Sequence, residues 1–191
     1  CPPKRTPDIH DFNMGLFTQG QYAQAMEENT NAEAITKVLY PSDNHAEGKL
    51  LRLTQQYFLC SASCQSIIRD HMAVYGTLSN LPDKVAIHLN DTHPTLVIPE
   101  LMRILVDEYF FPWEDAWSIV RRVCSYTNHT VMPEALETWN EDLFRLKLPR
   151  IYAIIKEINE DLVPVLDVPH ALQHRRVICK LREMIEYHKK G

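Results

Sequence analysis

The sequence predicts an α/β protein in which a short parallel sheet is surrounded by many helices. Residues 85–89 form a short, mostly apolar run that stops at a polar cluster, as does a strand of a parallel sheet, and we expect it to be buried on both faces. A second β-prone run leads into the polar residues 126–130. A helical pattern follows each run, and this order is typical of α/β folds.

Before the first strand, the chain is predicted to be mainly helical. Residues 1–19 are rich in Pro and are expected to be irregular, and two short helical segments follow at 21–28 and 32–40. Residues 41–45 have the composition of a turn. The longest helical pattern, 47–75, repeats apolar residues every three or four positions. We expect Gly76 to end this helix and 78–83 to be a connection.

After the first strand, helices are predicted at 96–109, with Pro99 in the first turn, and at 113–124. A short helical stretch at 135–139 precedes a helix at 141–158 that is interrupted near Pro149. Beyond residue 159 the pattern loosens, and 174–190 has a weaker, basic helical stripe.

Composition excludes several classes of protein. The 191 residues are 45% hydrophobic with a net charge of −5, which is ordinary for a globular protein and argues against a general nucleic-acid surface. No apolar run approaches the ~20 residues of a membrane-spanning helix. The N-terminus lacks both a signal peptide and an initiator Met, so we interpret it as an internal start. The five cysteines suggest a reduced, cytoplasmic setting, with Cys60 and Cys64 as small buried residues.

The candidate functional residues follow the two strands. Asn90, Asp91, Thr92 and His93 come after the first run, and Asn128 and His129 come after the second. Ligands of open α/β sheets bind outside the carboxyl ends of the strands, so these side chains are candidates for contact with a polar ligand. Asn, Asp and Thr before a helix are also the usual N-caps, and this second interpretation stays open.

A metal site built from His88, His93 and His129 is a further possibility from the residue types. His88 lies inside the predicted strand, and alternation of strand faces should point its side chain away from at least one of the other two. We therefore expect no metal site.

Several long motifs in fixed order resemble the α-glucan phosphorylases, which act on glycogen, starch and maltodextrin. The resemblance covers roughly residues 8–160. It is carried by the stretches 39–44, 47–58, 87–94, 98–101, 126–130, 133–139 and 148–159.

The resemblance implies a two-lobed, GT-B-like glycosyltransferase fold, of which this helix-rich chain is part of the first doubly wound lobe. Residues 1–160 correspond to a partial N-terminal lobe, and 161–191 form a divergent helical tail. The implied reaction transfers the terminal glucose of an α-1,4-glucan to inorganic phosphate, giving glucose 1-phosphate, with pyridoxal phosphate as cofactor. The cofactor lysine and the phosphate ligands belong to the missing C-terminal lobe, so we expect the isolated chain to be inactive.

The resemblance also implies roles for individual residues. Asp43 and Asn44 match a gate loop that closes on the glucose, and His129 matches the residue at the glucose 6-position. The expected glucan-binding residues are Tyr40, Arg52, Asp91, His93 and Glu134. The residues alone allow a second interpretation, in which Asp43 and Asn44 are ordinary turn residues and Arg52 is a solvated residue of a helix.

Two further expectations concern regulation and assembly. Arg69 matches an arginine that binds a nucleotide phosphate in regulated members, but Asp70 stands where those members have a second Arg, which puts nucleotide control in doubt. Residues 20–28 match a segment that makes subunit contacts, which implies a homodimer. The alternative function is a non-catalytic remnant that binds carbohydrate or dimerises.

Overall fold

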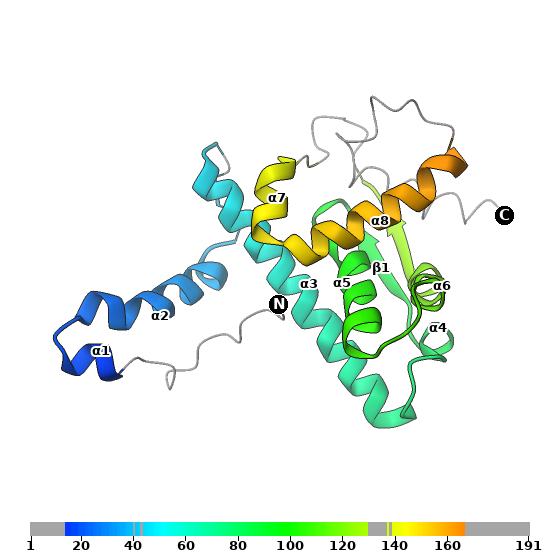
Figure 1. Cartoon of the computed structure of the whole chain (residues 1–191), viewed down its shortest axis with the longest axis horizontal. Coiled ribbons are helices and arrows are strands. Elements are labelled where there is room, and N and C mark those ends of the chain that lie inside the picture. Colours follow the sequence, from blue (N-terminus) through cyan, green and yellow to red (C-terminus); the bar gives the residue numbers. More distant parts are fainter. Residues whose placement is uncertain (1–13, 40, 43, 130–136, 138, 167–191) are drawn as a thin grey trace. The chain divides into compact units, whose positions relative to one another are not determined.

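The computed structural model describes residues 14–166 except 40, 43, 130–136 and 138 (Figure 1). The chain divides into two compact units, residues 1–59 and 60–191. Among the described residues, none of the helices combines the length and the apolar character that crossing a bilayer requires.

The first unit contains α1 (Met14–Thr18), α2 (Tyr22–Lys37) and the start of α3 (Ala46–Tyr75). The helix α1 corrects the expectation that 1–19 is irregular. The two predicted segments 21–28 and 32–40 are one continuous helix that ends at Lys37. Its middle is polar, but Thr30 donates a hydrogen bond from Oγ1 to the carbonyl of Met26 at 2.9 Å and so stays compatible with the helix.

The long helix α3 confirms the prediction for 47–75 within one residue. Gly76 ends it as expected: its φ of +68° is the left-handed conformation that glycine adopts without a Cβ clash. The Gly76 N–H donates to the Met72 carbonyl at 3.0 Å. Most residues of the predicted apolar stripe are buried, whereas Leu50 is exposed.

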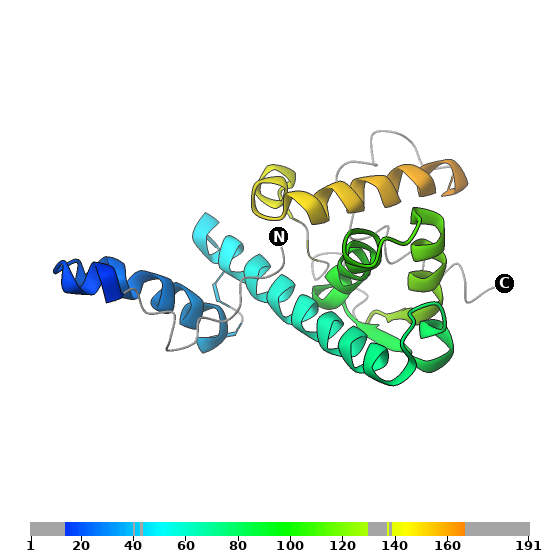
Figure 2. The same cartoon turned by 60° about the horizontal axis from the view of Figure 1, so that its bottom comes forward.

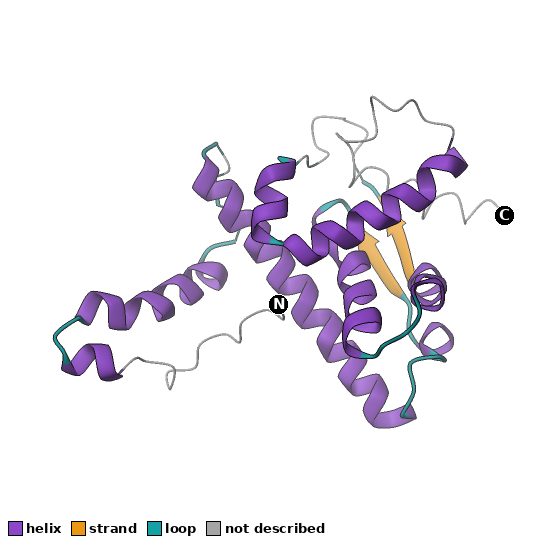
Figure 3. Ribbon diagram, viewed as in Figure 1, coloured by secondary structure: helices purple, strands orange, loops and turns teal. Residues whose placement is uncertain are grey.

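The second unit holds the end of α3 and all elements that follow it (Figure 3). Its remaining elements are α4 (Leu81–Lys84), β1 (Ile87–Asn90), η2 (His93–Leu96), α5 (Val97–Arg103), η3 (Ile104–Glu108), α6 (Trp113–Val123), β2 (Cys124–Thr127), α7 (Glu141–Lys147) and α8 (Pro149–Leu166). The predicted connection 78–83 thus contains part of the short helix α4. The predicted helix 96–109 is a 3-10 turn, an α-helix and a π-helical end in succession.

The two strands pair in parallel, as predicted, with Ile87 beside Cys124 and Asn90 beside Thr127. Among the described residues, the two faces of this pair differ in burial. Leu89, Cys124 and Tyr126 are buried, whereas His88 and Asn90 on the opposite face are exposed. The expectation of burial on both faces is therefore wrong for β1, because polar residues alternate with apolar ones along the strand.

The helix α5 forms the centre of the second unit. All seven of its residues are buried, and it packs against α6 and α8 (Figures 1 and 2). The amphipathic helix predicted at 113–124 is confirmed as α6, although Cys124 already belongs to β2. The chain reaches α6 through Phe110, whose φ is +58°.

A buried charged cluster joins α3, α5 and η3 within the second unit. The Glu100 carboxylate accepts two hydrogen bonds from Arg103, each 2.8 Å long, and one of 2.6 Å from Ser61 Oγ. Arg103 also lies 2.8 Å from the Glu108 carboxylate. The Glu100 side chain is fully buried and that of Arg103 is 5% exposed, so the charge of Arg103 compensates a carboxylate that is removed from water.

The cysteines described by the structure are packing residues. Cys60, Cys64 and Cys124 are buried free thiols. Burial raises the pKa of Cys60 and of Cys124 to about 12, and it also raises the pKa of Cys64. The expectation that Cys60 and Cys64 are small buried residues is confirmed.

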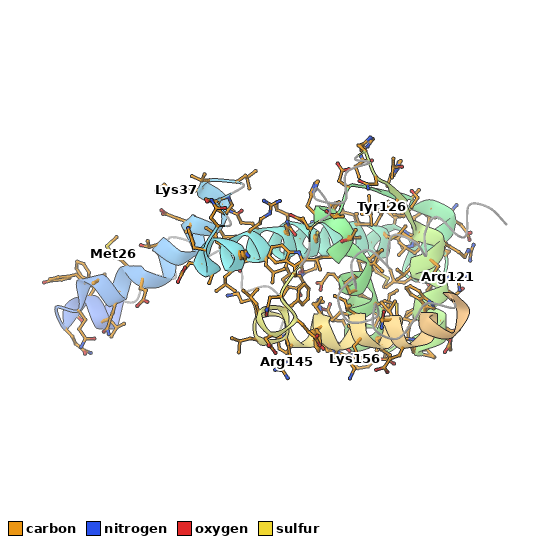
Figure 4. The ribbon with its side chains drawn as sticks, turned by 90° about the horizontal axis from the view of Figure 1, so that it is seen from above. Met26, Lys37, Arg121, Tyr126, Arg145 and Lys156 are labelled. Carbon is orange, nitrogen blue, oxygen red and sulfur yellow. The ribbon has the colours of Figure 1, made fainter. Side chains whose placement is uncertain are left out.

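The predicted interruption near Pro149 separates α7 from α8. Asn140 caps α7, because its side chain accepts a hydrogen bond from the Leu143 N–H at 3.0 Å. Arg145 and Lys156 point away from the neighbouring helices (Figure 4). The helices predicted at 135–139 and 174–190 lie mostly or wholly outside the described residues.

Candidate functional site at the carboxyl edge of the strands

The loops after β1 and β2 meet at Asp91. This residue has a φ of +63°, a left-handed conformation that Asp tolerates better than most residues. Its N–H donates to the Thr127 carbonyl at 2.8 Å and extends the strand pairing by one residue. Its Oδ1 accepts a hydrogen bond from the His129 N–H at 2.9 Å. The structure thus brings together the two loops that the sequence had identified separately.

A second set of contacts runs along the exposed face of the sheet. His88 Nε2 lies 2.6 Å from Thr127 Oγ1, and one step further His129 Nε2 lies 3.4 Å from Asn90 Oδ1. Both pairs join a β1 residue to the residue 39 positions later in the sequence. The His129 ring consequently lies at the end of a polar row on an open face, where a polar ligand could reach it.

The residues after β1 were predicted either to cap the following helix or to contact a ligand, and the contacts of Asp91 and Thr92 bear on the capping role. Thr92 precedes η2 without a side-chain capping bond, and Asp91 directs its carboxylate to His129 instead. The turn is closed by Thr95, whose Oγ1 donates to the Thr92 carbonyl at 2.6 Å. Asp91 therefore joins the two loops and does not cap the helix after β1.

The other predicted residues of the second unit lie at varied positions. His93 opens η2 and is half-buried, while Glu134 lies outside the described residues. In the part of the chain that the structure describes, no three His, Cys, Asp or Glu side chains are grouped so as to hold a metal ion. Arg69 is exposed on α3, with Nε 3.5 Å from Asp70 Oδ1 and Nη2 donating to Ser66 Oγ at 3.3 Å.

The predicted gate residues belong to the first unit. Tyr40 and Asp43 lie outside the described residues, Asn44 is exposed, and Arg52 on α3 is half-buried. After Asn44, the His45 Nδ1 accepts from the Gly48 N–H at 2.9 Å. A Cβ on Gly48 would lie 1.8 Å from the Ser42 carbonyl oxygen, so only glycine fits this close approach.

Two residues that support these segments were not predicted from the sequence. Gln55 is 4% exposed, and its Nε2 donates to the Val38 carbonyl at 2.7 Å, which fixes the chain just before the gate residues. Thr127 holds His88 through its hydroxyl and Asp91 through its carbonyl. The motif around Tyr126 contained Thr127, but Gln55 carries no local signal because its partner is 17 residues away.

Parallel strands with polar side chains at their carboxyl ends are typical of α/β proteins, many of which bind ligands at this edge of the sheet. Comparison with known families narrows this class. The family described as carbohydrate phosphorylase matches residues 5–190. The chain belongs to the carbohydrate phosphorylase family, and its helix-rich segment with a small parallel sheet is part of the phosphorylase fold.

Individual relatives agree with this assignment. The chain is 52% identical to a glycogen phosphorylase of Haemophilus influenzae over 149 residues, covering 78% of this chain and 18% of the relative. It is 47% identical to an α-1,4 glucan phosphorylase L isozyme of Vicia faba over 178 residues, covering 91% and 18%. It is 52% identical to the muscle form of glycogen phosphorylase of Ovis aries over 159 residues, covering 79% and 19%. The chain thus spans about a fifth of the length of these relatives.

Proposed function

We propose that this chain supplies glucan-binding residues of an α-glucan phosphorylase that transfers the terminal glucose of an α-1,4-glucan to phosphate, giving glucose 1-phosphate. The observation that carries the proposal is the junction of Asp91 with His129 at the carboxyl ends of paired parallel strands. Relatives named as glycogen and α-glucan phosphorylases share about half of the residues.

The chemistry of the sheet edge suits a sugar. Amide and imidazole groups donate and accept hydrogen bonds within one plane, and sugar hydroxyls require both. We assign the His129 ring to the glucose 6-hydroxyl and its carbonyl to the reacting end of the sugar, where a glycosyl transition state develops positive charge. His93 and Glu134 are assigned to contacts on the acceptor side of the glucan, and Asp91 belongs to the same part of the site.

The first unit contributes the gate in this proposal. Asn44 hydrogen-bonds the glucose, Asp43 shapes the catalytic pocket, and Tyr40 and Arg52 line the glucan wall. The segment 20–28 makes subunit contacts in a homodimer. Arg69 is assigned to a nucleotide phosphate. The carboxylate of Asp70 contacts the same guanidinium and would compete with that phosphate.

Pyridoxal phosphate serves the phosphorylase family in the full-length enzyme. The lysines that the structure describes, Lys37, Lys49, Lys84, Lys147 and Lys156, are all exposed. A Schiff-base lysine needs a desolvated or electropositive surrounding, so these residues do not fit the cofactor. We assign the cofactor lysine and the phosphate ligands to the C-terminal lobe of the full-length enzyme, which is the partner of this segment. The cytoplasmic location stays a prediction. Relatives of this chain include isozymes named as chloroplastic or amyloplastic.

Phosphorolysis tests the proposal. The full-length enzyme that carries this segment should release glucose 1-phosphate from maltoheptaose and phosphate. The 191-residue chain with added pyridoxal phosphate should give no turnover above a cofactor-only blank. A full-length protein that binds maltoheptaose, or dimerises, without releasing glucose 1-phosphate would favour the alternative of a non-catalytic binding module.

A further inference from the structure

We infer that Asp91 is a positioning residue, which holds His129 in place and does not itself contact the glucan. The inference rests on the proposed function, since it assigns to Asp91 a role at the same site. It replaces the glucan contact that the resemblance implies for this carboxylate.

The backbone around Asp91 is fixed before its side chain is considered. Its N–H is bonded to the Thr127 carbonyl, so the residue is attached to the end of β2 as well as to β1. Its left-handed φ of +63° ends the extended course of β1 at this point. The carboxylate therefore starts from a backbone anchored on both strands.

The carboxylate then bonds the backbone of His129, 38 residues further along the chain, at 2.9 Å. A bond from an N–H to a charged acceptor is stronger than one to a neutral acceptor. Asn90, the neighbour of Asp91, lies 3.4 Å from the ring of the same histidine. The last residue of β1, Asn90, and the residue that follows it, Asp91, thus contact the two ends of His129, the imidazole and the backbone N–H.

This arrangement gives His129 a fixed orientation although its side chain is exposed. A group that stabilises a transition state must be oriented before the reaction, because reorientation during the reaction lowers its effect. Loss of the acceptor oxygen at position 91 should therefore lower the turnover number and leave the glucan KM nearly unchanged. Loss of a direct glucan contact would raise the KM.

Two substitutions separate the carboxylate from the backbone conformation. Asp91→Asn keeps an oxygen acceptor and tolerates the left-handed conformation, whereas Asp91→Gly keeps the conformation and removes the acceptor. In the full-length enzyme, we expect Asp91→Gly to speed hydrogen exchange of the His129 amide and to lower kcat, each by roughly tenfold, as for the loss of one bond to a charged group. Asp91→Asn should stay within about threefold of wild type in both measurements.

Two results would overturn the inference. One is unchanged exchange of the His129 amide in Asp91→Gly, and the other is an Asp91→Asn variant with a strongly raised KM and a protected His129 amide. Hydrogen exchange does not depend on phosphorolysis. If exchange responds as expected while His129→Ala leaves kcat unchanged, the assigned role of His129 fails and the positioning contact stands.

Discussion

The gate turn, residues 41–45 before α3, and the carboxyl edge of β1 and β2 are held by different kinds of contact. The described part of the turn is bonded to near neighbours, as from Gly48 and Lys49 to His45. At the sheet edge, Asp91 and Asn90 contact His129 across 38 and 39 residues.

The difference predicts different effects of substitution. A side chain in the turn can be removed with little loss of folding stability, because its contacts are local and solvated. A side chain that holds the sheet edge supports both the fold and the site. The following predictions test this distinction.

The largest effect is expected in the buried charged cluster of α3, α5 and η3. Arg103→Met should lower the free energy of unfolding by about 3–5 kcal/mol, because it leaves the buried Glu100 carboxylate without its charged partner. Urea unfolding of the chain measures this. Arg145→Met is the matched control, since Arg145 and its partner Asp142 are largely exposed, and it should cost less than about 1 kcal/mol. Equal losses in the two variants would contradict the prediction.

The next effect concerns His129. In the full-length enzyme, His129→Ala should weaken binding of the transition state by roughly 2–4 kcal/mol while the fold is kept. His129→Asn should recover part of the loss, since an amide supplies one donor. Inhibition by glucose and by 6-deoxyglucose provides the test: wild type should bind the deoxy sugar less well, and the Ala variant should barely distinguish the two. Equal discrimination by both proteins would remove His129 from the sugar site.

At the gate turn, Asn44→Ala and Asp43→Ala should lower kcat by a factor that corresponds to about 1–3 kcal/mol, as for one hydrogen bond to the sugar. The unfolding free energy of Asn44→Ala should change by less than about 0.5 kcal/mol, because Asn44 is exposed and surface substitutions have small effects. Steady-state kinetics and urea unfolding of the same variants measure both quantities. Unchanged kinetics with lowered stability would return both residues to a purely structural role.

The smallest effect is a dependence on pH. Hydrogen bonds from Arg150 to both carboxylate oxygens of Asp107, at 2.5 and 2.8 Å, lower the pKa of Asp107. A lowered pKa stabilises the fold above the ordinary value of about 3.9, and this contribution is lost as the pH falls through the folded pKa. Arg150→Met should therefore cost less than about 1 kcal/mol at pH 6, because the pair is partly exposed, and less at pH 2.5 than at pH 6. Urea unfolding at the two pH values measures it, and an equal cost at both would contradict the linkage.

Local patterns predicted the long elements of this fold well. The stripe in 47–75, the amphipathic stretch from Trp113 and the break at Pro149 depend on neighbouring residues, and all three are found. The pattern failed where distant contacts decide the structure. The open face of β1 depends on which elements cover the sheet, and the role of Gln55 depends on a carbonyl 17 residues away.

The candidate site divides in the same way. The sequence identified both loops and their residue types, but the meeting of Asp91 with His129 was not predicted, because it depends on the pairing of β1 with β2. It did not show that Asp91 bonds a backbone N–H, because that contact requires a left-handed residue at the end of β1. Tyr40, Asp43 and Glu134 stay predictions, since they lie outside the described residues.

The parallel pairing of β1 with β2 has a consequence for the order of folding. Residues 91–123, which include α5 and α6, must fold back before Ile87 can lie beside Cys124. Contacts between residues far apart in sequence carry a larger loop-closure cost and form later than helical turns. We therefore expect pulsed hydrogen exchange during refolding to protect the amides of α6 before that of His129. Slow closure of the sheet edge would expose the unpaired strands to other chains during synthesis, at a place where ligand binding is proposed.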